Sequence, residues 1–210
     1  MNIKRLQAGI YAANCYIVAS SDLSEAIVVD PGGDADMILS EINKLAAKVK
    51  GILLTHGHGD HIGGVMALNK SLGVPVMVHK ADLEMVKSSE LNFSSSMAMD
   101  EVIIEPDVLL TDGDEISIGN EKLLVIHTPG HTRGGICLYT LGHLITGDTL
   151  FKGSIGRTDL YGGDFDTIIR SIKNKLLRLP EDTIVYPGHG PESSIGFEKQ
   201  RNPFLKNTKG

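Results

Sequence analysis

The chain has 210 residues, of which 41% are hydrophobic and 22% are charged, a composition typical of a globular protein with a substantial core. The formal net charge of −6 and the isoelectric point near 5.7 argue against non-specific binding to nucleic acid or to a membrane surface. No apolar run is long enough to span a bilayer, and residues 1–5 are not followed by the apolar core of a signal peptide. We therefore expect a cytoplasmic protein with one domain over residues 1–210 and a small-molecule partner, whereas the oligomeric state is not indicated.

The N-terminal half alternates between strand-like and helical patterns. Apolar runs separated by glycine and serine predict strands, and apolar residues at helical spacing predict helices, the first of which Asp34 or Asp36 can cap. The predicted strands cover 3–6, 15–19, 26–30, 51–54 and 74–78. The predicted helices cover about 34–48, 61–72 and 81–87.

The C-terminal half returns mainly to strands. Residues 88–107 have weak periodicity and are expected to form a surface loop, with a mobile wall over a binding site as the alternative. The predicted strands that follow cover 108–110, 115–118, 123–126, 136–139, 144–146 and 183–186. A helix is expected from Asp164 to a point before Pro180. This order predicts an α/β protein with two stacked sheets covered by helices on the outside.

The densest group of polar residues is Thr55-His56-Gly57-His58-Gly59-Asp60-His61, directly after a predicted strand. Imidazole and carboxylate groups are preferred ligands of zinc and similar divalent cations. His56 and His58 lie two residues apart, so their side chains point the same way if the extended backbone continues. Asp60 and His61 form a second pair at the start of a predicted helix, which Asp60 is placed to cap. The motif predicts a metal site with further ligands from elsewhere in the chain.

Three later polar residues share one setting, the end of an apolar strand next to glycine or proline. They are His131, Asp148 and His189. Binding sites assemble from loops at one end of such sheets, so we expect these residues to join the first cluster. Together the cluster and these residues supply five histidines and two aspartates, enough donors for two metal ions.

The complete pattern, His-x-His-x-Asp-His followed by single His, Asp and His residues, resembles the metallo-β-lactamase superfamily over essentially the whole chain. The resemblance implies a four-layer αββα sandwich, in which two mixed β-sheets are flanked by helices. It also implies two divalent metal ions, with zinc expected and iron or manganese as alternatives. By this resemblance one ion is held by His56, His58 and His131, the other by Asp60, His61 and His189, and both are bridged by Asp148.

The segment 150–159 resembles the one after the bridging aspartate in glyoxalase II (hydroxyacylglutathione hydrolase) and its shorter relatives. Arg157 falls where glyoxalase II has a basic residue for the glutathione moiety, so the resemblance makes it a substrate-binding candidate. Tyr161, close to the same loop, is a second candidate. Glyoxalase II continues into a helical domain with further glutathione contacts, whereas only residues 190–210 follow His189 in this sequence, which leaves the use of glutathione open.

By the same resemblance we expect a metal-dependent hydrolase that cleaves an anionic thioester such as S-lactoylglutathione. Two metal ions about 3.5–4 Å apart can share a hydroxide, because coordination lowers the pKa of water toward roughly 7. That hydroxide attacks the thioester carbonyl, and a thiolate leaves readily because the pKa of a thiol is roughly 8.5. The expected catalytic carboxylates are Asp148 and Asp60, the latter as a ligand that orients the hydroxide.

The same residues are compatible with other functions. Persulfide dioxygenases also resemble the chain, including Gly-Arg-Thr-Asp at 156–159, and that resemblance implies one iron held by His56, His131 and Asp148. Net acidity and the short chain disfavour a nuclease, and flavodiiron proteins usually carry Glu where His58 stands. A structural zinc module is the non-enzyme alternative, but structural sites are closed tetrahedra, whereas seven ligands for two metals leave room for solvent.

The remaining reactive residues are expected to be structural. Cys15 and Cys137 lie in apolar strand-like runs and should be buried, reduced thiols. Asp159 is expected to form an ion pair with nearby Arg157 or to support a turn, and Thr55 either to orient a ligand or to end its strand. Packing or surface roles are expected for three histidines that match no ligand position: His79, His127 and His143.

Overall fold

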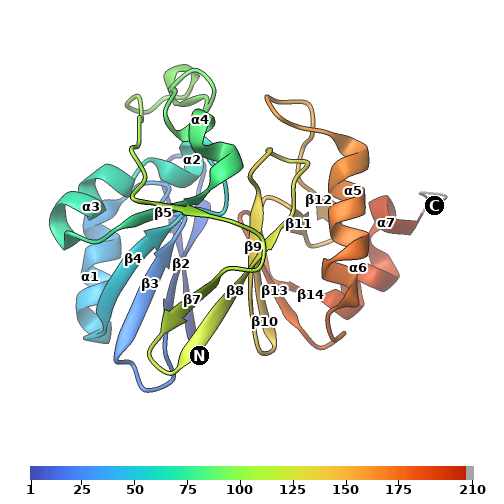
Figure 1. Ribbon diagram of the computed structural model, residues 1–210, viewed down its shortest axis with the longest axis horizontal. Coiled ribbons are helices and arrows are strands. Elements are labelled where there is room, and N and C mark those ends of the chain that lie inside the picture. The colour runs from blue at the N-terminus through green and yellow to red at the C-terminus, as the bar shows by residue number, and fades with distance from the viewer. Residues whose placement is uncertain (207–210) are drawn as a thin grey trace.

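The strand-like runs of the sequence form two β-sheets stacked face to face, in a computed structural model that describes residues 1–206 (Figure 1). Within these residues, sheet A has the order β1 (Asn2–Ala8), β2 (Ala13–Ala19), β3 (Glu25–Val29), β4 (Lys48–Leu53), β5 (Val76–His79) and β6 (Val108–Leu110). Sheet B has the order β14 (Ser193–Ser194), β13 (Ile184–Pro187), β10 (His143–Gly147), β9 (Ile136–Thr140), β8 (Glu121–His127) and β7 (Glu115–Ile118). The hairpin of β11 (Leu150–Phe151) and β12 (Ser154–Ile155) stands apart.

Both sheets are mixed, and their parallel parts determine where loops meet. In sheet A, β3 to β6 run parallel, while β1 and β2 are antiparallel to their neighbours. In sheet B, β10 and β13 are parallel, and the other neighbouring pairs are antiparallel. Parallel neighbours end at the same edge of a sheet. The loops after β3 and β4, and those after β10 and β13, are therefore neighbours at one edge.

Helices cover the outer face of each sheet, as Figure 1 shows on the left and right. Sheet A is covered by α1 (Ala35–Leu45) and α3 (Val65–Leu72). Sheet B is covered by α5 (Phe165–Asn174), α6 (Ile195–Arg201) and α7 (Pro203–Lys206). Shorter helical turns lie in the loops: α2 (Gly59–Ile62), η1 (Lys80–Asp82), α4 (Leu83–Val86), η2 (Ser94–Ser96) and η3 (Leu176–Arg178). The expected four-layer αββα sandwich is confirmed.

Three apolar cores hold the four layers together, because successive strand residues point to opposite faces. Ile17 packs against α1 and α3, while its neighbour Val18 packs between the two sheets. A third core joins sheet B to its helices. The two cysteines are buried and free, as predicted, with Cys15 in the first core and Cys137 in the third.

The single helix predicted for 61–72 was wrong, because the chain forms α2 and α3 with a break at Gly63 and Gly64. The amide of Gly64 donates a hydrogen bond to the Pro31 carbonyl at 2.7 Å. A Cβ on Gly63 would lie 2.6 Å from the Gly32 carbonyl oxygen, so only glycine allows this approach. The break is thus caused by a contact with the loop after β3.

Two helix ends also differ from expectation. Asp60 lies inside α2 rather than at its cap, which is His58, and no side-chain capping bond is formed there. The helix predicted to reach Lys48 ends at Leu45, because Ala46 adopts a left-handed conformation with φ 54°. In contrast, the helix expected from Asp164 is present as α5, and Asp164 caps it, with its carboxylate accepting from the Thr167 amide at 2.7 Å.

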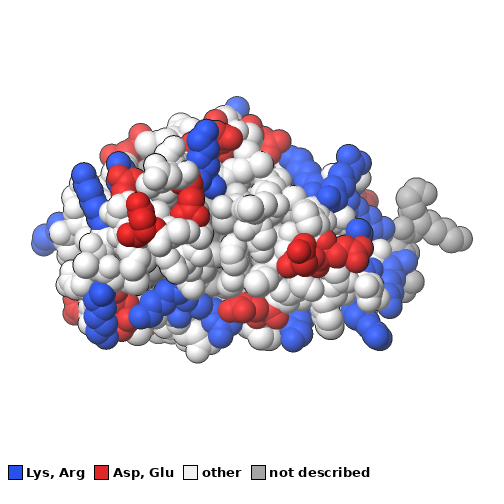
Figure 2. All heavy atoms as spheres, turned by 90° about the horizontal axis from the view of Figure 1, so that it is seen from below, with Lys and Arg blue, Asp and Glu red and all other residues white. Residues whose placement is uncertain are grey.

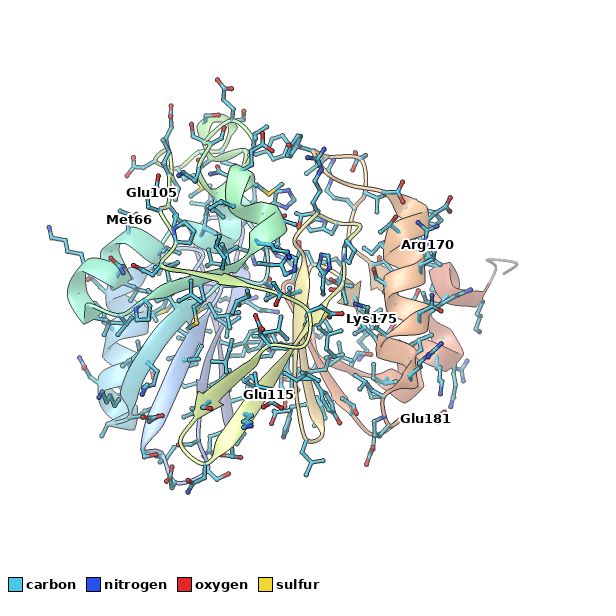
Figure 3. All side chains as sticks on the ribbon, in the orientation of Figure 1. Met66, Glu105, Glu115, Arg170, Lys175 and Glu181 are labelled. Carbon is cyan, nitrogen blue, oxygen red and sulfur yellow. The ribbon has the colours of Figure 1, made fainter. Side chains whose placement is uncertain are left out.

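The outer surface carries charges of both signs. On the lower face of the molecule, acidic and basic side chains are interspersed (Figure 2). Arg170 on α5 and Met66 on α3 project from the two helical layers (Figure 3). Within residues 1–206, no helix has both the length and the apolar character that crossing a membrane requires.

Candidate metal centre

The structure brings all seven predicted ligands together at the edge of the sandwich where the loops after β4, β8, β10 and β13 meet. His56 and His58 follow β4, and Asp60 and His61 lie in α2. His131 lies between β8 and β9, Asp148 follows β10, and His189 follows β13. Both sheets therefore contribute ligands to one cluster.

The first group consists of His56, His58 and His131, whose donor atoms all lie within 4.8 Å of one another. Nδ1 of His58 is 2.9 Å from Nε2 of His131, and all three side chains are buried. Nε2 of His56 is buried and has no hydrogen-bond partner. A buried polar atom without a partner is costly, and a cation among these nitrogens would supply the partner.

The second group consists of Asp60, His61 and His189, whose donor atoms also lie within 4.8 Å of one another. Nε2 of His189 is 3.2 Å from an Asp60 carboxylate oxygen and 3.1 Å from Nε2 of His61. His61 is fully buried, whereas the His189 side chain is 32% exposed. This group is therefore the more open of the two.

Asp148 lies between the two groups. Its Oδ1 is 3.4 Å from Nε2 of His61, and its Oδ2 is 3.7 Å from Nε2 of both His131 and His189. Oδ1 is also buried without a hydrogen-bond partner. One carboxylate thus faces histidines of both groups, the position required of a bridging ligand.

The protonation states of His56, His58 and Asp148 suit cation binding, whereas His61 must lose a proton first. Burial would lower the pKa of His61, but Asp148, Asp30 and Asp60 raise it well above its usual value. Burial lowers the pKa of His56, and burial together with His131 lowers the pKa of His58 to about 3, so both imidazoles are neutral at pH 7. Burial alone would raise the pKa of Asp148, but the surrounding histidines, His61 foremost, hold it below its usual value. Neutral imidazole and ionised carboxylate are the forms that coordinate a metal.

Asp30, which the sequence reasoning missed, forms a third close group of donor atoms with His56 and His61 and orients these two histidines. Its carboxylate accepts hydrogen bonds from the Thr55 amide at 2.7 Å and the Thr55 hydroxyl at 2.5 Å, and it lies 3.2 Å from Nδ1 of His61. The Thr55 hydroxyl is also 3.1 Å from Nδ1 of His56. Partners on Nδ1 leave Nε2 for a metal, a common arrangement around ligating histidines. Asp30 ends an apolar strand before Pro31, a setting shared with the later ligands.

The position before His189 has room only for glycine, Gly188. A Cβ at this position would lie 2.1 Å from Oδ1 of Asp148 and 2.7 Å from Cε1 of His61. Any side chain would displace both groups. The loop after β13 can approach the cluster only with glycine here.

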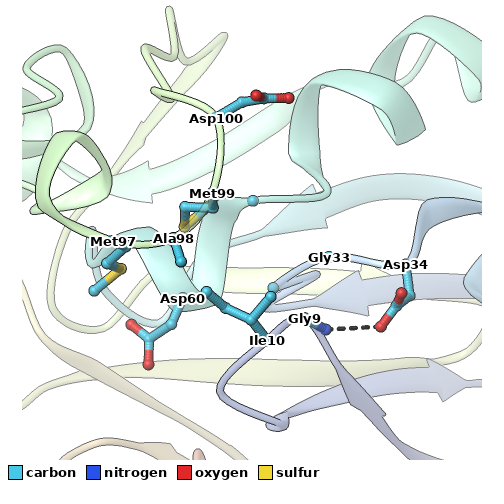
Figure 4. Close-up of a pocket in the computed structure, with 11 residues that line it drawn as sticks. Gly9, Ile10, Gly33, Asp34, Asp60, Met97, Ala98, Met99 and Asp100 are labelled. Atoms are coloured by element: carbon cyan, nitrogen blue, oxygen red, sulfur yellow. Dashed lines mark hydrogen bonds between the residues drawn. The ribbon is translucent and has the colours of Figure 1, made fainter.

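Two adjoining cavities open beside the cluster and share Asp60 and Met97 in their walls. The smaller, about 340 Å³, is lined by Tyr11, His58, Asp60, Phe93, Ser96, Met97, His131, Asp148, Arg157 and Leu160. The larger, about 780 Å³, lies between the β1–β2 turn, the loop after β3 and residues 97–100 (Figure 4). There Asp34, one of the two predicted caps, occupies the N-cap position of α1, but its carboxylate makes no capping bond and accepts a hydrogen bond from the Gly9 amide at 2.8 Å. The long loop 88–107 thus forms a wall of both cavities.

The two substrate candidates occupy different positions. Arg157 lines the smaller cavity, and its guanidinium donates two hydrogen bonds to Asp159, at 2.8 and 2.9 Å, so the predicted ion pair is confirmed. Tyr161 is not among the residues that line either cavity. Its hydroxyl donates to Glu84 at 2.9 Å and accepts from Arg133 at 3.1 Å.

A family model described as the metallo-beta-lactamase superfamily matches residues 8–189. The chain belongs to this superfamily. The fold, the family match and the His and Asp cluster together make it a metallo-hydrolase of that superfamily with a candidate metal site.

Two relatives are similar over nearly their whole length. The chain is 39% identical to the probable metallo-hydrolase YqgX of Bacillus subtilis, with 98% of each chain covered. It is 35% identical to the hydroxyacylglutathione hydrolase GloC of Haemophilus influenzae, again with 98% of each covered.

Solved structures show the same fold. The crystal structure of BLEG-1, described as a B3 metallo-beta-lactamase, matches with a TM-score of 0.92 and 40% identity, covering 98% of this chain and all of the other. TTHA1623 in a di-iron-bound form matches with a TM-score of 0.86 and 33% identity, covering 96% and 100%. ETHE1 from Myxococcus xanthus matches with a TM-score of 0.82 and 27% identity, covering 97% and 84%.

Proposed function

We propose that this protein is a thioester hydrolase with two divalent metal ions, acting on a hydroxyacyl thioester such as S-lactoylglutathione. The observation that carries the proposal is the position of Asp148, whose carboxylate faces histidines of both three-donor groups. The choice of substrate is supported by the similarity to GloC, a hydroxyacylglutathione hydrolase of nearly equal length.

The ligand assignment follows the two groups. His56, His58 and His131 would hold one ion, Asp60, His61 and His189 would hold the other, and Asp148 would contact both. The unpartnered Nε2 of His56 and Oδ1 of Asp148 fit this role, because a cation completes the partners of each. When bound, such ions lower the pKa of coordinated water so that hydroxide is available at neutral pH.

The chain's own residues supply the rest of the site. Ionised Asp60 and Asp148 contribute the negative charge that balances bound cations, and Asp60, at the junction of the two cavities, is placed to orient a water molecule. Phe93, Met97 and Leu160 give the smaller cavity an apolar wall for the acyl and thiol parts of a substrate. A thiolate needs no strong general acid to leave, because the pKa of a thiol is roughly 8.5.

Arg157 is the proposed contact for a negatively charged part of the substrate. Its Nε and Nη2 donate to Asp159, and within residues 1–206 its Nη1 has no recorded hydrogen bond. One edge of the guanidinium therefore stays available at the smaller cavity. Tyr161 could act only through Arg133 or after a rearrangement of its hydrogen bonds.

The test combines metal analysis of the purified protein with assays of thioester cleavage, β-lactam hydrolysis and oxygen uptake on glutathione persulfide. We expect two metal equivalents per chain and cleavage of S-lactoylglutathione that does not depend on oxygen and stops on chelation. Hydrolysis of a β-lactam without thioester cleavage would overturn the proposed substrate class in favour of the chemistry of BLEG-1. One metal equivalent with no thioester cleavage would overturn the proposal as a whole.

A second candidate is a single-iron oxygenase acting on glutathione persulfide. The specific observations are the Gly-Arg-Thr-Asp segment at 156–159, which resembles persulfide dioxygenases, and the similarity to ETHE1. TTHA1623, a chain 33% identical to this one, also holds iron, but in a di-iron form, so the number of irons per chain decides between the two candidates. In this function, His56, His131 and Asp148 would hold one iron. Oxygen uptake on glutathione persulfide with one iron per chain would support it.

A further inference from the structure

Asp82 is a buried carboxylate that joins two of the ligand loops. It lies at the end of η1, only 1% exposed, and accepts three hydrogen bonds. The donors are the Gly57 amide at 3.1 Å, the Thr132 hydroxyl at 2.7 Å and the Gly134 amide at 2.5 Å. Gly57 belongs to the loop after β4, and the other two donors belong to the loop between β8 and β9.

The donors sit directly beside the first group of histidines. Gly57 separates His56 from His58, and Thr132 follows His131. The packing is tight, because a Cβ on Gly134 would lie 2.5 Å from the Asp82 nitrogen. One side chain thus holds the backbone next to all three histidines.

The second group is oriented by a different carboxylate, Asp30, which also reaches His56 of the first group through the Thr55 hydroxyl. Asp30 lies 3.2 Å from Nδ1 of His61, whereas no hydrogen bond recorded for residues 1–206 joins Asp82 to Asp60, His61 or His189. Among the hydrogen bonds of residues 1–206, Asp82 therefore supports only the first group, whereas Asp30 supports members of both. A defect at Asp82 should act on one group more than on the other.

We infer that Asp82 is a positioning residue for the first metal site, setting the cation affinity of His56, His58 and His131 without touching the cation. The inference rests on the two-metal centre proposed above. Its physical basis is preorganisation, since the ligands of a loosely held loop must be ordered when the cation binds. Burial raises the pKa of Asp82, and the hydrogen bonds from Thr132, Gly134 and Gly57 oppose that shift and favour the ionised acceptor.

The first variant is Asp82→Asn, which keeps the shape but turns one acceptor oxygen into a donor that faces an amide or hydroxyl hydrogen. The second is Thr132→Val, which removes only the hydroxyl donor and keeps Asp82 in place. Thr132→Ser is its matched control, because serine retains the hydroxyl. Glu198→Gln controls for a buried carboxylate elsewhere, since Glu198 is fully buried and accepts from the Gly153 amide and the Asn202 amide group.

Zinc affinity is measured for each protein by competition with a chromophoric chelator, together with the thermal midpoint before and after zinc addition. We expect Asp82→Asn to lower the affinity for one of the two zinc ions by about 10- to 100-fold. The affinity for the other zinc ion should stay within about twofold of the wild-type value. Thr132→Val should lower the affinity for the same zinc ion by a smaller factor. Thr132→Ser and Glu198→Gln should bind both zinc ions with wild-type affinity.

Four outcomes would count against the inference or its basis. Unchanged zinc affinity in both Asp82→Asn and Thr132→Val would overturn the positioning role. Equal weakening of both ions, or a lower thermal midpoint of the zinc-free protein with unchanged affinity, would assign Asp82 a general structural role instead. Wild-type protein that binds fewer than two zinc ions would refute the proposed function itself, and this is seen before any variant is compared.

Discussion

At the scale of single residues, the cluster shows how acidic groups can stay ionised when buried. Asp148 is only 12% exposed, yet His61, His131 and His189 stand within 3.7 Å of its oxygens. Burial would raise the pKa of Asp148, but the interaction with these histidines, His61 foremost, outweighs burial and lowers it. The residue is therefore prepared as a ligand before any cation arrives.

Replacing Asp148 with alanine should remove metal and activity together. The substitution takes away the one carboxylate that faces both groups, so we expect less than one metal equivalent per chain and loss of turnover by at least about 100-fold. Elemental analysis and the S-lactoylglutathione assay measure the two effects. Normal metal content with normal turnover would contradict the bridging assignment.

Replacing Arg157 with alanine should change binding rather than chemistry. Its open Nη1 edge is proposed to contact an anionic group, so KM for an anionic glutathione thioester should rise by about 5- to 20-fold with kcat nearly unchanged. A neutral thioester serves as the internal control and should show little change in KM. Equal effects on both substrates would remove Arg157 from the contact surface.

At the scale of elements, the strands and the ligand loops were predictable because their signals are local. Alternating and continuous apolar runs marked the strands, and each ligand stands just after such a run. The break between α2 and α3 was not predictable, because it depends on contact with the loop after β3, distant in sequence. The roles of Asp30 and Asp82 depend equally on which loops become neighbours, which no local pattern states.

The ends of β5 and β8 carry a stacked pair of histidines that joins the two sheets. The rings of His79 and His127 have centroids 4.0 Å apart and planes inclined by 17°. Burial, followed by the charges of His127 and Lys80, lowers the pKa of His79 from 6.5 to about 4, and the smaller effects of Asp112 and Asp114 oppose this shift. The folded protein therefore favours the neutral ring.

This depressed pKa predicts a loss of stability in acid. The contribution of neutral His79 to the free energy of unfolding is complete above pH 6.5, where the ring is neutral in both the folded and the unfolded protein. It declines as the pH falls toward 4, because the unfolded chain binds the proton first. From pH 7 to pH 5 the expected loss is about 2 kcal/mol. Chemical denaturation at both pH values should show a correspondingly smaller loss in His79→Phe, which keeps a ring for stacking. An identical loss in the two proteins would contradict the prediction.

At the scale of the whole molecule, each three-donor group draws on both sheets. The first takes His56 and His58 from the loop after β4 and His131 from sheet B, and the second combines residues of α2 with His189. The αββα architecture was predictable from the resemblance and the order of elements. The two cavities and the support that Asp82 gives to the first group were not, because they arise from side chains that meet only after the sheets have stacked.

Metal removal should therefore destabilise the whole fold. A cation present at about 100 times its dissociation constant adds roughly 2.7 kcal/mol per site, which for a chain of this size corresponds to roughly 5–10 °C in Tm. Thermal denaturation before and after chelation, with zinc restored as the control, measures this shift. Asp148→Ala should show a smaller shift, and a wild-type Tm insensitive to chelation would contradict the proposed sites.

The order of the strands has one more consequence. All of sheet A precedes all of sheet B in the chain, and the two are connected by the short turn at 111–114. A single backbone cut in this turn would separate His56, His58, Asp60 and His61 from His131, Asp148 and His189. Neither fragment would retain a full set of donors. Recovery of hydrolysis on mixing the two fragments would then report their reassembly, which makes the chain suited to use as a split reporter.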